Sequence, residues 1–145
     1  MRYLAESFVL GALRRGHPNE QFLGPVYAAE RLGVRYVEVT PKAGRFEIFL
    51  HTVEAVGHQA FLDLVKFPPL DQDDEEEQFY RLVTAAGDPL SALKAAEDVT
   101  GAVRQRWVNA SMSQDEYADF VRAGRPQHSS PDRHPWPAPT GQPAQ

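Results

Sequence analysis

The chain has 145 residues, of which 42% are hydrophobic, and this length suits one domain with a single core. Twenty acidic residues against fifteen basic ones give a net charge of −5. This balance argues against direct nucleic-acid binding, because phosphate contacts normally require a basic surplus. The chain has no cysteine, which excludes disulfides, thiolate metal sites and a cysteine nucleophile.

The first predicted element runs from Phe8 to Arg15. Ser7 is placed to cap it as a helix and Gly16 to end it, but the apolar run VLGAL fits a buried strand equally well. The next segment, Glu20–Gly24, is expected to be a loop with a short edge element. The sequence therefore leaves helix and strand open for this N-terminal part.

A β-hairpin gives the strongest local signal in the sequence. Val34–Thr40 is rich in β-branched and aromatic residues, Pro41–Gly44 supplies turn chemistry, and Arg45–Val53 alternates between two faces. One face of the second strand is apolar and predicts a core; its residues are Phe46, Ile48 and Leu50. The other face is either half-covered by a helix or a binding surface; its residues are Arg45, Glu47, Phe49 and His51.

Two further strands are predicted after the hairpin. Phe61–Phe67 fits a third strand, which Pro68 ends because proline cannot donate to a strand ladder. Phe79–Ala85 fits a strand or a short helix, and its aromatic and β-branched content favours the strand.

Two helices have clear start and stop signals. Asp88 is an N-cap residue followed by proline at the first helical position, and Gly101 ends this helix. Ser113 and Glu116 have the spacing of a capping box for a last helix, which Gly124 ends.

Together these elements predict an α+β fold, with a small, mainly antiparallel sheet and two to three helices packed on one side. Residues 1–123 are expected to form this single domain. Residues 124–145 are expected to form a disordered, proline-rich tail, since six prolines lie between Pro126 and Gln145 and no large aliphatic side chain does.

The sequence carries no recognised catalytic or cofactor motif. G-x-S-x-G, S-x-x-K, the P-loop, G-x-G-x-x-G and H-E-x-x-H are all missing, and an EF-hand loop starting at Asp71 would have Leu82 in place of its final glutamate. We therefore expect a non-enzymatic protein with no cofactor and no metal. No apolar run reaches the ~18 residues of a membrane span, and Glu6 interrupts the stretch that a secretory signal would keep apolar, so a cytoplasmic protein without membrane contact is expected. Twelve arginines against three lysines, with plentiful Ala, Gly and Pro, indicate a GC-rich bacterial genome.

The densest charge lies between positions 71 and 77, where six of seven residues are acidic. This acidic run is either a solvated loop or an electrostatic docking site for a basic protein. Aromatic side chains would anchor such a partner if they are exposed, although Trp107 also suits the core. The residues predicted to bind the partner are Asp71, Asp73, Asp74, Glu75, Glu76, Glu77, Tyr80, Trp107 and Tyr117.

The alternative is a small enzyme or a ligand-binding domain that uses the polar face of the hairpin. Arg45, Glu47 and His51 would form its pocket, joined by Tyr36 or Glu38 if the strand register turns them to the same side. A concave pocket over this face, together with a raised or lowered histidine pKa, would favour the alternative, and a flat, filled or helix-covered face would count against it.

Five short strings remain: GALRRG (Gly11–Gly16), EQFLG (Glu20–Gly24), FPPLD (Phe67–Asp71), RWVN (Arg106–Asn109) and QDEYADFV (Gln114–Val121). They resemble uncharacterised bacterial proteins of similar length, some of them immunity proteins encoded beside polymorphic toxins. The resemblance spans residues 1–123 and carries no catalytic residue over to this chain. It implies an inhibitor that occludes a basic partner such as a toxin nuclease, in agreement with an acidic, non-enzymatic binding protein.

Overall fold

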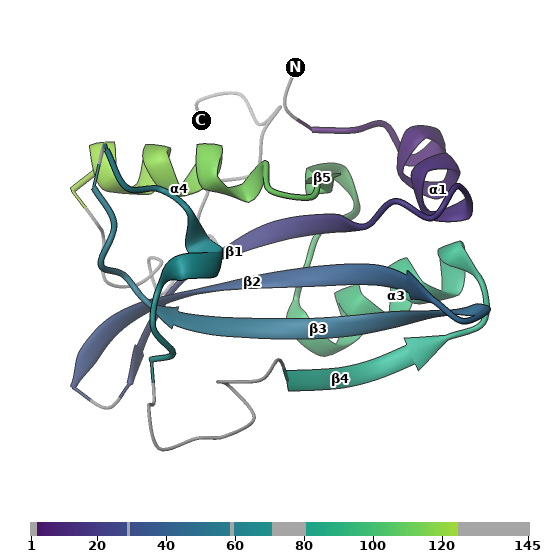
Figure 1. The fold of residues 1–145 in the computed structure, drawn as a ribbon, viewed down its shortest axis with the longest axis horizontal. Helices are drawn as coiled ribbons and strands as arrows, with labels where there is room; N and C mark the ends of the chain where they lie inside the picture. Colours follow the sequence, from purple (N-terminus) through teal and green to yellow (C-terminus); the bar gives the residue numbers. More distant parts are fainter. Residues whose placement is uncertain (1–2, 29, 59, 71–80, 125–145) are drawn as a thin grey trace, which may run out of the picture.

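The computed structural model describes residues 3–28, 30–58, 60–70 and 81–124. They form a five-stranded antiparallel sheet with the strand order β4-β3-β2-β1-β5 and three α-helices, which confirms the predicted α+β class (Figure 1). The elements are α1 (Glu6–Arg14), β1 (Asn19–Ala28), β2 (Arg31–Lys42), β3 (Arg45–Glu54), η1 (Leu64–Lys66), β4 (Arg81–Ala86), α3 (Pro89–Thr100), η2 (Arg104–Arg106), β5 (Val108–Asn109) and α4 (Ser113–Arg122).

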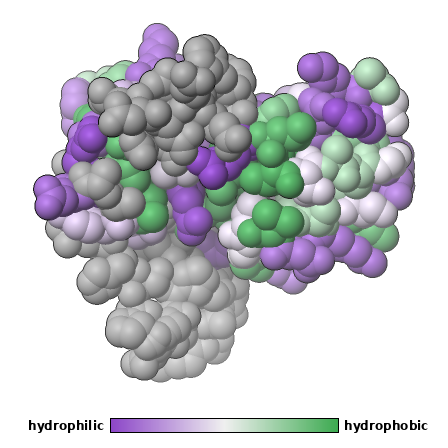
Figure 2. Space-filling model, turned by 90° about the horizontal axis from the view of Figure 1, so that it is seen from below, coloured by the Kyte–Doolittle hydropathy of each residue, from purple (hydrophilic) through white to green (hydrophobic). Residues whose placement is uncertain are grey.

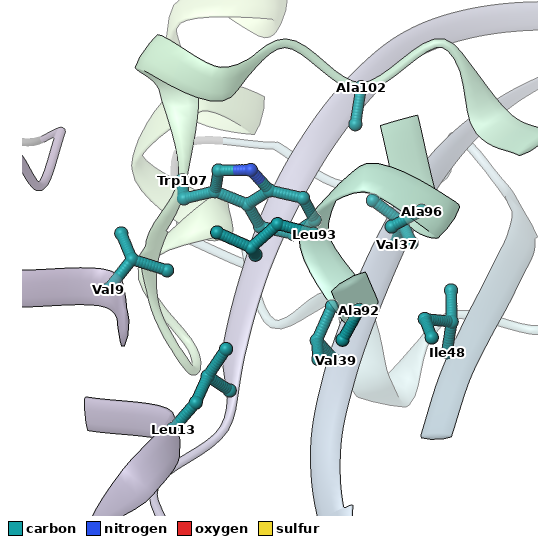
Figure 3. Close-up of a cluster of buried hydrophobic side chains, with 10 residues drawn as sticks. All are labelled: Val9, Leu13, Val37, Val39, Ile48, Ala92, Leu93, Ala96, Ala102 and Trp107. Atoms are coloured by element: carbon teal, nitrogen blue, oxygen red, sulfur yellow. The ribbon is translucent and has the colours of Figure 1, made fainter. Parts of the chain in front are cut away.

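Both faces of the sheet are packed, because successive side chains of a strand point to opposite sides. On one face, α1 and α3 enclose an apolar cluster of Val9, Leu13, Val37, Val39, Ile48, Ala92, Leu93, Ala96, Ala102 and Trp107 (Figure 3). On the other face, α4 and the 61–70 segment pack on a second cluster of Phe22, Val34, Tyr36, Val53, Leu64, Phe67, Tyr117 and Phe120. In Figure 1, α3 lies behind the sheet and the teal 61–70 segment passes in front of it. Two helices thus share one side, as predicted, and the third lies on the opposite one.

The hairpin forms where it was predicted, with longer strands. The β2–β3 ladder runs from Gly33 opposite Glu54 to Lys42 opposite Arg45, so the turn consists of Ala43 and Gly44 alone. Both turn residues have positive φ, 51° and 82°, as a two-residue type I′ turn requires. Pro41 and Lys42 belong to the strand, so the turn occupies only the last two of the four residues predicted for it.

The predicted strand at Phe61–Phe67 is wrong. This segment contains the short helix η1, which Asp63 starts by accepting a hydrogen bond from the Val65 backbone N–H at 3.3 Å. Phe61 forms an isolated bridge with His58 before the helix, and its ring packs edge-on against Phe67 after it, with centroids 5.0 Å apart. Phe61, Leu64 and Phe67 all contribute to the second cluster. The segment is therefore apolar because these side chains are packed against the sheet, although it is not itself a strand.

The two elements left open are now assigned. Phe8–Arg15 lies largely in helix α1, whose N-cap is Ala5 without a side-chain hydrogen bond, so the predicted Ser7 cap is wrong. Residues 81–85 of the 79–85 segment belong to strand β4, as favoured, and residues 79 and 80 lie outside the described part of the chain. Figure 2 views the molecule from below the orientation of Figure 1, where β4 is the lowest strand, and apolar residues gather near the middle of this face among hydrophilic ones.

Strand β1 is much longer than the short edge element expected at Glu20–Gly24. It has ten residues and pairs with β2 on one side and with β5 on the other. Its polar start is buried, and tertiary hydrogen bonds hold Asn19 and Gln21 there. Asn19 Nδ2 donates to the Val108 carbonyl at 3.2 Å, and the Gln21 amide exchanges two hydrogen bonds with the Val103 backbone, at 2.9 and 2.8 Å.

The helix α3 has the predicted ends. Asp88 Oδ1 accepts from the Ser91 N–H at 2.9 Å, Pro89 is the first helical residue, and Gly101 ends the helix with φ 81°. Among the described residues no helix is long and apolar enough to cross a membrane. The acidic run at 71–77 and residues 125–145 of the predicted tail lie outside the described part.

The capping box predicted for α4 is wrong. The helix starts at Ser113, the N-cap is Met112, and no side chain of the cap residue bonds to the helix. Instead, the Ser113 N–H donates to Glu20 Oε2 of β1 at 3.0 Å. Glu116 is buried and accepts a hydrogen bond from the Tyr3 hydroxyl, so it does not reach back to its own helix start.

Candidate functional site

A pocket of about 510 Å³ lies on the face of the sheet that η1 and α4 share. This volume is within the range of small-molecule sites. The strands β1, β2 and β3 provide most of its lining, and the segments 65–69 and 110–111 provide the rest. The lining residues are Glu20, Tyr36, Glu38, Thr40, Lys42, Glu47, Phe49, His51, Val53, Val65, Phe67, Pro69, Ala110 and Ser111.

The register of β2 and β3 arranges the pocket side chains in order along the strands. Beginning at the hairpin, the facing pairs on this side are Lys42 with Arg45, Thr40 with Glu47, Glu38 with Phe49, and Tyr36 with His51. At about 3.3 Å per residue, the distance from Glu47 to Val53 is roughly 20 Å. The pocket is therefore elongated, with charged groups towards the hairpin and aromatic and aliphatic groups towards the other end.

Tyr36, Glu38 and His51 form one connected group at the centre of the pocket. The rings of Tyr36 and His51 stack with centroids 4.4 Å apart and an interplanar angle of 12°. His51 Nε2 lies 3.2 Å from Glu38 Oε1. This hydrogen bond from His51 is the main reason that the pKa of Glu38 lies below its ordinary value, and burial opposes it. Since an ionised carboxylate can only accept, Nε2 of His51 carries the hydrogen.

Glu47 is the second carboxylate of the pocket, and it pairs with Arg45 two residues earlier on the same face of β3. Arg45 Nη2 lies 2.5 Å from Glu47 Oε2. The Glu47 side chain is only 8% exposed, whereas the Arg45 side chain is 54% exposed. The buried carboxylate is thus neutralised by a cation that stays largely in water.

Glu20 is the third carboxylate and comes from β1. It lies directly opposite Glu38 in the β1–β2 ladder, an arrangement in which like charges repel. The Ser113 N–H at the start of α4 donates to Glu20, and a carboxylate at a helix N-terminus is also stabilised by the helix dipole. Each of the three carboxylates therefore has an internal hydrogen-bond donor.

The pocket as a whole is suited to a positively charged group. Its lining contains three carboxylates and a single lysine, Lys42, at the hairpin end. A metal ion is a poor fit, since within the described ranges no three His, Cys, Asp or Glu side chains come close enough to hold one. Aromatic rings lie beside the carboxylates, since Phe49 faces Glu38 and Tyr36 stacks on His51, so the pocket can hold an organic cation along its length.

The alternative site predicted from the sequence falls in this pocket. Glu47 and His51 line it, and Arg45 contacts Glu47 at its edge. Tyr36 and Glu38, whose side of the strand the sequence left open, both face into it. The polar face of the hairpin is thus concave, which is the arrangement that favours the alternative over a flat surface.

The residues predicted to bind a protein partner are placed differently. Trp107 and Tyr117 are both 0% exposed, so they cannot anchor a partner at the surface. Trp107 packs among the residues of the first cluster and donates from Nε1 to Glu97 Oε2 at 3.2 Å (Figure 3). Tyr117 accepts a hydrogen bond from the Gly57 N–H at 2.8 Å. Tyr80 and the acidic run Asp71–Glu77 lie outside the described residues.

Several pocket residues were not predicted. The sequence predicts Glu20 in a loop with a short edge element, and it predicts Val65, Phe67 and Pro69 in a strand and its end. The alternation of β2 was the one usable signal, because it places Thr40 and Lys42 on the same face as Glu38. Glu20 carries no comparable signal, since only its pairing with β2 brings it to the pocket.

Comparison with protein-family models finds no matching family, and comparisons with curated proteins and with solved structures find no significant match. The site is therefore interpreted from its own geometry.

Proposed function

We propose that this domain is a ligand-binding protein whose sheet-face pocket takes an organic cation with an apolar body. The observation that carries the proposal is the lining of the pocket. Three carboxylates from three neighbouring strands lie beside aromatic and aliphatic side chains in one pocket of about 510 Å³.

The charge of the ligand follows from the carboxylates. Glu38 stays ionised to lower pH than an ordinary glutamate, because its pKa is lowered. Glu20 faces Glu38 across the ladder, and a cation between them would relieve their repulsion. A partly buried site also strengthens the attraction of opposite charges, because fewer water molecules screen it. An anionic ligand would be repelled by the same carboxylates.

The apolar body of the ligand follows from the rest of the lining. Tyr36, Phe49 and Phe67 provide aromatic rings, and Val53 and Val65 provide aliphatic surface. Val65 is strongly exposed for an apolar residue, at 71%, so a ligand could remove its surface from water. Aromatic rings also attract cations at their faces.

The test uses three probes with one carbon skeleton: 4-phenylbutylamine, 4-phenylbutanol and 4-phenylbutyrate. Titration calorimetry at pH 7 should give the strongest binding for the amine and the weakest for the acid. E38Q and E47Q should each weaken amine binding about tenfold, the usual order for a hydrogen bond to a charged group. D98N is the matched control, since Asp98 is an exposed acid of α3 on the other side of the sheet, and it should bind as the wild type does.

Equal affinity for the amine and the acid would contradict the proposal. So would amine binding that neither E38Q nor E47Q weakens. Circular dichroism and thermal unfolding of each variant would separate a lost contact from a lost fold.

We also propose, as a second candidate, the acidic inhibitor expected from the sequence, an immunity-type protein that occludes a basic partner. It is supported by the net charge of −5 and by the run of six acids between positions 71 and 77. Replacing Asp73, Asp74, Glu75 and Glu76 by lysine should then weaken binding of a basic protein captured from the source lysate and reduce its salt dependence. Unchanged affinity and salt dependence would mean that the run is a solvated segment only.

A further inference from the structure

The ion pair at the hairpin end of the pocket joins a buried carboxylate to an exposed cation. Glu47 is 8% exposed and lines the pocket, and Arg45, 54% exposed, reaches it from outside the lining. Across the described part of the chain, Arg45 alone donates a hydrogen bond to Glu47. A buried carboxylate without a nearby cation is strongly unfavourable, so this position requires a positive group.

We infer that Arg45 stands in for the ligand, and that the cationic group of the ligand is a guanidinium that replaces Arg45 on Glu47. The inference rests on the proposed cation-binding pocket and specifies its ligand class. Arg45 and Glu47 lie two residues apart on one face of β3, so the site already holds a guanidinium bound to its carboxylate in this structure.

The geometry of the internal pair leaves room for a better partner. Arg45 uses only Nη2, on Oε2 of Glu47. A guanidinium can instead make two parallel hydrogen bonds to both oxygens of a carboxylate. Arg45 is tied to the same strand, whereas a free ligand approaches Glu47 along the pocket and can align both N–H groups with the carboxylate. An ammonium group has no such planar fork and gains less from this carboxylate.

The exchange has a low cost on the side of the protein. Arg45 is already 54% exposed, so its guanidinium returns to water with little change in its own solvation. The buried Glu47 keeps a positive partner throughout, because one guanidinium replaces the other. The ligand must nevertheless compete with Arg45, so removing Arg45 should make binding tighter.

The experiment compares 4-phenylbutylguanidine with 4-phenylbutylamine by titration calorimetry on the full chain. The wild type should bind the guanidine roughly tenfold more tightly than the amine, as an added hydrogen bond to a charged group predicts. R45Q should raise the affinity for the guanidine at least about two- to fivefold, because the ligand then no longer competes with the largely exposed Arg45 for Glu47. E47Q should bind the two probes equally.

The control is K42Q, which also removes one positive charge from the hairpin end of the pocket but leaves the pair on Glu47 intact. It should change guanidine affinity less than R45Q does. Both positions are exposed, but R45Q also leaves the buried Glu47 without its cation, so thermal unfolding of both variants checks that each still folds.

Each remaining outcome decides the question. Guanidine binding that R45Q leaves unchanged or weakens would overturn the inference, as would an equal gain in K42Q, which would indicate a general charge effect. If the wild type still prefers the amine over 4-phenylbutyrate, the proposed function survives that failure. If the wild type binds neither cation, the proposed function itself fails and the inference fails with it.

Discussion

Glu20 links the pocket to the start of α4, and replacing it by alanine should destabilise the protein. Glu20 is 8% exposed and Ser113 is fully buried, so E20A leaves the Ser113 N–H without its acceptor and away from water. An unsatisfied buried donor costs about 1–3 kcal/mol, and loss of a carboxylate at a helix N-terminus costs about 0.3–1 kcal/mol more. Relief of the repulsion with Glu38 returns about 0.2–1 kcal/mol. The net expectation is a loss of about 2 kcal/mol.

The matched variant is E20Q, which keeps an oxygen that can accept from Ser113 and removes the like charge opposite Glu38. Its unfolding free energy should stay within about 1 kcal/mol of the wild type, because the lost dipole interaction and the relieved repulsion nearly cancel. Urea unfolding followed by far-ultraviolet circular dichroism measures both variants, and hydrogen exchange at the first amides of α4 locates the effect. Surface substitutions ordinarily change the unfolding free energy by up to about 0.5 kcal/mol. If E20A changes it by no more than this, or if E20Q destabilises as much as E20A, Glu20 does not hold the start of α4.

Two further predictions concern Glu38 and Gly57. His51 lowers the pKa of Glu38 in the folded state, so ionised Glu38 stabilises the fold above its unfolded pKa near 4.5, and this stabilisation is lost as the pH falls through the lower folded pKa. The wild type should therefore lose more thermal stability than E38Q between pH 6 and pH 3. Parallel curves of melting temperature against pH would contradict this prediction. G57A should lower the unfolding free energy by about 1–3 kcal/mol, since a Cβ at this position would clash with the Tyr117 ring and would meet the Phe61 carbonyl at 2.6 Å. G87A is the control, because a Cβ there meets open space, and it should leave the unfolding free energy unchanged.

The sequence alone determined the features that depend on neighbouring residues. The hairpin follows from the alternation of Arg45–Val53 and from the turn chemistry before it, and α3 follows from Asp88, Pro89 and Gly101. These signals are local, because a turn, a cap or an alternating strand needs only a few consecutive residues. The same alternation identified the polar face of β3, and thus Glu47 and His51 in the pocket.

The tertiary structure decided which polar residues are buried and which aromatic residues are exposed. The start of β1 has no strand signal in its sequence, and it becomes a strand where Asn19 Nδ2 donates to β5 and the Gln21 amide bonds to the Val103 backbone. Ser113 and Glu116 are the residue types of a capping box, yet the acceptor for the Ser113 N–H is Glu20 of a strand distant in sequence. Trp107 and Tyr117 are residue types that often anchor protein interfaces, but Trp107 lies in the first cluster and Tyr117 in the second.

The pocket also needed the tertiary structure. Its three carboxylates come from positions 20, 38 and 47, and only the register of three strands brings them to one face. Its far wall comes from the 65–69 segment, which the sequence indicated as a strand and which the 3₁₀ turn places over the sheet. Local patterns fix the direction of each side chain relative to its own strand, whereas the pairing of strands distant in sequence decides which side chains meet.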